Sequence, residues 1–94
     1  MQNVDLKDTI PMMNSDDYKE RFKAEYYQTK ARYEKLKAFN TRIEAANRTG
    51  YSLEKRVAMP KHDCPDELLR DQQRVMGEYL HILEVRDVIE NVEL

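Results

Sequence analysis

The chain contains few of the residues that cross-link a small protein or break its helices. It contains one cysteine, Cys64, so no disulfide can form within a single copy. It has no tryptophan, and only two glycines and three prolines occur among its 94 residues. Charged residues make up 36% of the sequence, which is typical of long solvated helices. These features predict an all-α fold.

Long apolar segments are also missing. No run approaches the length of about 18 residues that a membrane-spanning helix needs. The first residues do not combine a basic stretch with an apolar core, as a secretory signal would. We therefore expect no membrane partner and a cytoplasmic location.

The sequence shows no recognisable catalytic or metal-binding arrangement. His62 and Cys64 lie two residues apart, but a zinc site needs about four ligands and no second cluster is present. A glycine-rich phosphate loop and a hydrolase nucleophile elbow are missing as well. We expect no metal, no cofactor and no enzymatic activity.

Charge is divided unevenly along the chain. Residues 16–61 hold 12 Lys and Arg against 7 Asp and Glu, whereas residues 62–94 hold 3 against 9. One interpretation is a pair of antiparallel helices with complementary charge. The other is a basic surface for a phosphate-bearing ligand. The acidic net charge of −2 argues against binding to bulk nucleic acid.

Hydrophobic periodicity predicts two long helices within one domain. The expected segments are an arm over 1–14, then a domain over 15–94 with a helix at about 16–47, a connector over 48–64 and a helix at about 65–90. A lone two-helix hairpin buries little surface per residue, so association of several copies would stabilise it. The predicted architecture is an antiparallel hairpin of two long helices with a short N-terminal arm, assembled as a homo-oligomer.

The helix ends carry recognisable signals. Ser15 is a suitable N-cap for the first helix, and Gly50 suits the position after its end. Pro65 fits the first position of the second helix, and Glu90 near its end opposes the helix dipole and predicts fraying. Pro11 should prevent a continuous helix in the arm.

The first helix has two opposite faces that could both be buried. One face alternates steps of four and three: Phe22, Tyr26, Thr29, Tyr33, Leu36, Asn40 and Ile43. The other repeats alanine every seven residues: Ala24, Ala31, Ala38 and Ala45. Two opposed faces suggest two packing partners, so we predict that the alanines form an oligomer interface. The alternative is that alanine simply favours helix on an exposed surface.

The second helix has a broad apolar arc, and Gly77 lies on the face opposite to it. The arc covers about half of the circumference and comprises Leu68, Leu69, Val75, Met76, Tyr79, Leu80, Ile82, Leu83 and Ile89. Gly77 lies away from the arc and costs about 1 kcal/mol relative to alanine, so another helix or a ligand is expected to approach the backbone there. We assign Gly77 to the oligomer interface.

Two small groups of residues are candidates for ligand binding. Arg70 and Arg74 lie near Gly77 and suit a phosphate. On the first helix, Tyr27 and Lys30 could stack on a base and contact a phosphate. The alternatives are a solvated arginine face and a tyrosine that anchors an interface.

Two stretches resemble a family of small phage proteins catalogued after an uncharacterised product of a crAss-like phage. They are MNSDDYKERFKAEYYQTKARYEKLKAF (13–39) and CPDELLRDQQRVMGEYLHILEVRDVIENVEL (64–94). The second contains the pattern L-L-x-x-Q-x-x-x-M-x-x-Y-L-x-I-L-x-x-R, which here runs from Leu68 to Arg86. The architecture is also similar in outline to the phage anti-CBASS sponges, small helical oligomers that bind cyclic nucleotides between subunits.

These resemblances imply three functions. The first is a non-enzymatic phage accessory protein that antagonises bacterial defence by sequestering a small nucleotide signal between subunits. The second is a module that binds a host or phage protein through its apolar helical face. The third is a structural or packaging accessory without a ligand.

Overall fold

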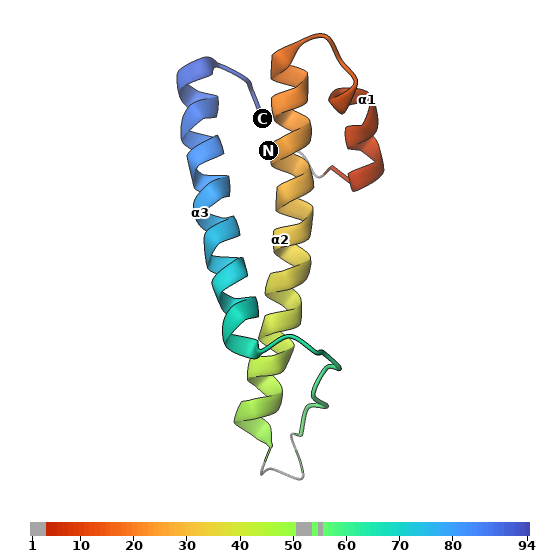
Figure 1. The fold of residues 1–94 in the computed structure, drawn as a ribbon, viewed down its shortest axis with the longest axis vertical. Helices are drawn as coiled ribbons and strands as arrows, with labels where there is room; N and C mark the ends of the chain where they lie inside the picture. The colour runs from red at the N-terminus through yellow and green to blue at the C-terminus, as the bar shows by residue number, and fades with distance from the viewer. Residues whose placement is uncertain (1–3, 51–53, 55) are drawn as a thin grey trace.

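The computed structural model describes residues 4–50, 54 and 56–94. These residues form a short 3-10 helix, η1 (Leu6–Asp8), and the helices α1 (Thr9–Met13), α2 (Tyr18–Thr49) and α3 (Asp66–Glu90). The two long helices pack side by side and antiparallel, and α1 lies against the N-terminal half of α2 (Figure 1). The all-helical hairpin predicted from the sequence is thus confirmed for the described part of the chain. None of its helices is both long and apolar enough to span a bilayer.

The ends of α2 differ in detail from the sequence prediction. Its N-cap is Asp17, whose carboxylate accepts a hydrogen bond from the backbone of Lys19 at 2.9 Å. The prediction of Ser15 was wrong, because its hydroxyl instead accepts from the backbone of Asp17 and shapes the turn that precedes the helix. At the other end, Gly50 keeps right-handed helical angles (φ −56°, ψ −28°), so its conformational freedom is not used. The predicted connector lies partly on residues 51–53 and 55, outside the described part.

The N-terminal arm folds back onto its own chain. Pro11 lies in the first turn of α1, where a helix has no acceptor for the missing N–H. As predicted, no continuous α-helix runs through the described part of the arm, which holds a 3-10 helix and the five residues of α1. Thr9 is fully buried, and its hydroxyl accepts a hydrogen bond from the Gln28 amide at 3.0 Å. Ala24, one turn before Gln28, is 1% exposed. The arm therefore covers the N-terminal end of the alanine face.

The core gathers at the end of the hairpin where the arm and the C-terminal tail meet. Its buried members come from α2, α3 and the tail: Phe22, Tyr26, Tyr27, Leu80, Leu83 and Val92. Tyr26 donates a hydrogen bond to Glu84 at 2.6 Å, and burial together with that carboxylate raises the pKa of the Tyr26 hydroxyl well above its usual range.

The C-terminal tail is fixed, not frayed. Asn91 adopts the left-handed conformation (φ 54°, ψ 51°), which asparagine tolerates better than most residues. The chain then turns back, and the Asp87 carboxylate accepts the backbone N–H groups of Glu93 and Leu94 at 2.7 and 3.3 Å. Because Val92 enters the core, the predicted fraying of this end was wrong.

Gly77 permits a close contact within the chain. A Cβ atom at this position would lie 3.3 Å from Cε1 of Tyr33, a ring that α2 presents to α3. The sequence prediction of a close approach is confirmed, and the approaching group is a side chain of the same copy. The other end of the hairpin, around Asn40 and Asp66, holds fewer apolar side chains and leaves a polar groove.

Candidate functional site

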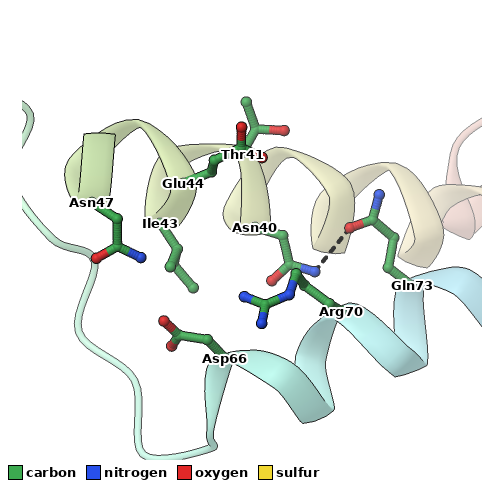
Figure 2. A pocket seen from close by; sticks show the side chains of 8 residues that line it. All are labelled: Asn40, Thr41, Ile43, Glu44, Asn47, Asp66, Arg70 and Gln73. Carbon is green, nitrogen blue, oxygen red and sulfur yellow. Dashed lines mark hydrogen bonds between the residues drawn. The ribbon is translucent and has the colours of Figure 1, made fainter. Parts of the chain in front are cut away.

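A groove of about 300 Å³ lies between the C-terminal half of α2 and the first turns of α3. The side chains that line it are mostly polar: Asn40, Thr41, Ile43, Glu44, Asn47, Asp66, Arg70 and Gln73 (Figure 2). Small-molecule sites usually measure about 300–1,000 Å³, so the groove is large enough for one small ligand. We refer to it as the α2–α3 groove.

Asn40 presents an unpaired acceptor at this groove. Its amide nitrogen donates to the backbone carbonyl of Leu69 at 3.1 Å and to Oε1 of Gln73 at 2.9 Å. The carbonyl of Leu69 can only accept, so it fixes which end of the Asn40 amide carries the hydrogens. The remaining atom, Oδ1, is buried and finds no donor in the described part of the chain. A buried acceptor without a partner costs about 1–3 kcal/mol, which a bound donor would recover.

Arg70 supplies a positive charge to the same groove. Figure 2 shows its guanidinium group and the Asp66 carboxylate reaching from α3 into the space below Asn40 and Ile43. Arg70 is exposed, and the described residues provide it with no ion pair. A free guanidinium offers several donors in one plane, the geometry that matches phosphate or carboxylate oxygens. The first turn of α3 adds the positive end of a 25-residue helix.

The two acidic side chains of the groove are already paired. Glu44 accepts from Arg48 at 2.8 Å, one turn along α2. Asp66 accepts from Nε2 of His62 at 2.5 Å, and the other ring nitrogen of His62 lies 2.7 Å from the carbonyl of Pro60. These contacts reduce the repulsion that the carboxylates would exert on an anionic ligand.

His62 also connects the chain before α3 to α2. Its ring meets Phe39 edge to face, with centroids 5.7 Å apart. Hydrogen bonds to the Pro60 carbonyl and to Asp66, with the nearby charge of Asp63, raise the pKa of His62 above its usual value of 6.5. Both partners of the ring are hydrogen-bond acceptors, so the contacts match a ring with an N–H on each nitrogen, and they hold Asp66 at the edge of the groove.

We expect this interaction to be visible as a pH effect. Because the folded pKa of His62 is raised, its stabilising contribution is complete below about pH 6.5 and is lost as the pH rises through the folded pKa. NMR titration of the imidazole resonances should give a midpoint above 6.5, and Asp66→Asn should lower it. A midpoint unchanged by Asp66→Asn would show that the contact does not form in solution.

The structure separates the predicted ligand residues. Arg70 lines the α2–α3 groove, whereas Arg74, one turn further along α3, pairs with Glu78 at 3.2 Å. Tyr27 is 4% exposed and belongs to the core. Lys30 lies 6.0 Å from the centre of the Tyr26 ring. Within one copy, Tyr27 and Lys30 lie roughly 20 Å along α2 from the groove and cannot share a small ligand with Arg70.

The predicted oligomer residues are likewise in different surroundings. Ala24 is buried beneath the chain's own arm, Ala31 and Ala45 are half-buried, and Ala38 is exposed. Gly77 is half-buried beside Tyr33. In this fold Ala24 is buried within its own chain, and Gly77 lies against Tyr33 of its own chain. The oligomer interface stays a prediction.

Sequence reasoning missed Asn40 as a groove residue and placed it on the buried face of the first helix. The alternation of steps correctly assigned it to that face. A polar asparagine among aromatic and aliphatic residues was the feature that could have marked it as a polar site residue. Between the described residues, no group of three or more His, Cys, Asp or Glu side chains has the geometry of a metal site.

The family model described as Sequestin matches residues 16–89, which span α3 up to its last turn, all of α2 and the groove between them. No curated protein and no solved structure matches the chain.

Proposed function

Because the chain belongs to the Sequestin family, we propose that it sequesters a small nucleotide signal, holding it in the α2–α3 groove without chemical change. The family name indicates sequestration, and the matched residues 16–89 include every residue that lines the groove. The observation that carries the proposal is that neither the buried Oδ1 of Asn40 nor the guanidinium of Arg70, which line the same groove, has a partner among residues 4–50, 54 and 56–94.

The chemistry of the groove suits the two ends of a nucleotide. Arg70 can bind phosphate oxygens with two parallel hydrogen bonds. The amides of Asn40, Asn47 and Gln73 combine donors and acceptors, the pairing that asparagine and glutamine use on the edges of bases. Ile43 adds an apolar contact for the ring. A ligand that offers both an N–H group and a phosphate would satisfy both unpaired groups at once.

The resemblance to small phage proteins suggests the setting. We propose that the protein is a non-enzymatic phage accessory protein that acts in the cytoplasm of an infected bacterium. By lowering the free concentration of a nucleotide signal, it would antagonise the defence that the signal activates. The sequence predicted that the ligand binds between subunits, but the α2–α3 groove is built by a single chain, and we place the ligand there.

A nucleotide panel tests this proposal directly. The panel contains cyclic mononucleotides, cyclic dinucleotides and ADP-ribose-type nucleotides, with inorganic phosphate and adenosine as controls. A ligand at a concentration 100 times its Kd adds about 2.7 kcal/mol to the free energy of unfolding. Each kcal/mol raises the Tm of a domain of this size by about 4–8 °C. We therefore expect at least one nucleotide to raise the Tm by about 10–20 °C, and neither control to do so.

Chromatography of the released ligand completes the experiment. Sequestration predicts that the nucleotide is recovered intact and in stoichiometric amount after the protein is denatured. Loss of the nucleotide during incubation would show an enzyme, and a Tm unchanged across the whole panel would overturn the proposal.

A further inference from the structure

Three ionisable side chains follow one another at intervals of four residues, from the segment before α3 to the α2–α3 groove. They are His62, Asp66 and Arg70. His62 contacts Asp66. Asp66 and Arg70 both line the groove, yet the described part of the chain shows no ion pair between them. Figure 2 shows both side chains reaching from α3 into the same space. Asp66 thus has one cationic partner that it contacts and a second that it leaves open.

The order and spacing of Asp66 and Arg70 favour an ion pair. On a helix, side chains four residues apart have Cβ atoms about 5–6 Å from each other, and a carboxylate that precedes the cation agrees with the helix dipole. Glu44 and Arg48 have the same order and spacing on α2, and they pair at 2.8 Å. The Asp66 carboxylate instead meets Nε2 of His62. A competing partner for Arg70 is therefore present on its own helix.

The charge of His62 determines how firmly its ring holds Asp66. One ring nitrogen faces the carbonyl of Pro60 and the other faces the carboxylate of Asp66. A protonated imidazole donates to both acceptors, whereas a neutral imidazole carries a single N–H and can donate to only one of them. The Pro60 carbonyl belongs to the backbone, so Asp66 is the partner that can rotate away. Loss of the ring's charge also removes its attraction for the carboxylate.

Two further carboxylates lie near this pair. Asp63 acts on the imidazole from the segment before α3, and Glu44 lines the groove from α2, where it accepts from Arg48. The side chain with which α2 meets the imidazole is the uncharged ring of Phe39. Within the described part of the chain, Arg70 is the cation that lines the groove. A released aspartate is repelled by the carboxylates and attracted to this guanidinium.

We propose that Asp66 is an internal competitor for Arg70 and that His62 controls it. While His62 is protonated, the carboxylate stays at the edge of the groove and Arg70 is open to a phosphate. When His62 is neutral, the carboxylate turns to Arg70 and occupies its guanidinium. Asp66 and His62 are thus positioning residues of the phosphate site. The effect on ligand affinity rests on the proposed function, whereas the exchange of partners is a property of the free protein.

Carbon-detected NMR of the free protein follows the arginine side chains through the titration of His62. Its hydrogen bonds raise the pKa of His62, so the state with Arg70 open occupies the range below the imidazole midpoint and the paired state the range above it. We expect the Cζ–Nε resonance of Arg70 to shift with that midpoint. Arg74 is the internal control, because its pairing with Glu78 does not involve His62, and its resonance should stay in place.

Two substitutions separate the partners. Asp66→Asn removes the competitor, so the Arg70 resonance should no longer follow the pH. His62→Gln keeps a hydrogen-bond donor without a titratable charge, so Arg70 should stay paired across the range. Circular dichroism verifies that both variants remain helical. A wild-type Arg70 resonance that ignores the His62 midpoint, or one that still follows it in Asp66→Asn, would overturn the proposal.

Isothermal titration on both sides of the midpoint measures the consequence for the ligand, with the nucleotide that gives the largest Tm shift. An exposed pair of this spacing forms with an equilibrium constant of about 2, and loss of the imidazolium charge adds to its effect. We expect the wild-type affinity to be about three- to fivefold lower about one pH unit above the midpoint than about one unit below it. In Asp66→Asn the difference should shrink to less than about twofold, and comparison of the two proteins cancels any titration of the nucleotide itself.

The two measurements distinguish failure of this inference from failure of the proposed function. Equal wild-type affinities on both sides of the midpoint would overturn the inference and leave nucleotide binding intact. If Arg70 follows His62 but no nucleotide binds, the proposed function fails and the exchange of partners stands.

Discussion

Replacement of Leu83 by alanine is expected to lower the free energy of unfolding by about 2–5 kcal/mol. Leu83 is 1% exposed and packs with Phe22, Tyr26 and Val92, so truncation leaves a cavity that several elements border. A natural domain has a total stability of about 5–15 kcal/mol, so the loss is a large share of it. Urea unfolding followed by circular dichroism at a fixed protein concentration measures the change.

Val88→Ala provides the comparison on the same helix. Val88 is 81% exposed, and substitutions at such surface positions usually change stability by less than about 0.5 kcal/mol. A cost below about 1 kcal/mol for Leu83→Ala would mean that α3 is rotated about its axis relative to the packing described above. Equal effects at the two positions would lead to the same conclusion.

The two long helices could be predicted because their signals are local. Repeated steps of three and four define the buried face, and α2 begins and ends two residues later than the pattern indicated. The cap was harder to assign, because Ser15 and Asp17 are both suitable residues and only the backbone path selects one. Pro65 was placed one position too far into the second helix for the same reason.

The arm and the tail could not be predicted because they depend on contacts between distant segments. Thr9 is buried only where Gln28 meets it, 19 residues along the chain. Val92 enters the core only after Asn91 turns the backbone into the left-handed region. Tyr27, which was predicted to bind a ligand, is buried for the same reason, because its ring packs in the core at this end of the hairpin.

The α2–α3 groove likewise combines a feature that local sequence predicts with one that depends on contacts between distant segments. Arg70 was predicted from the sequence as a phosphate ligand on its residue type and its position away from the apolar arc, and the structure places it at the groove. The groove itself depends on the register of the hairpin, which brings Asn40 beside Leu69 and Gln73 and leaves one oxygen unpaired. A sequence pattern contains no information on that register, so Asn40 was classified only as a residue of the buried face.

Arg70→Gln is expected to weaken nucleotide binding by about 10- to 100-fold. A hydrogen bond to a charged group contributes about 1.5–3 kcal/mol, and each 1.4 kcal/mol changes an affinity tenfold. Glutamine keeps much of the side-chain length and some hydrogen-bonding capacity, but it removes the charge. Isothermal titration with the nucleotide that gives the largest Tm shift measures the loss, and the unfolding transition of the free variant should stay within about 0.5 kcal/mol of the wild type.

Arg74→Gln is the matched control, because it removes the same charge one turn away on the same helix. Arg74 pairs with Glu78 and does not line the groove, so we expect its loss to change the affinity by less than about threefold, the effect of a screened distant charge. Equal losses for the two variants would instead indicate a general attraction to the arginine face of α3, as the sequence alone suggested. A loss confined to Arg74→Gln would move the ligand out of the groove. Only selective sensitivity to Arg70 agrees with a phosphate held beside Asn40.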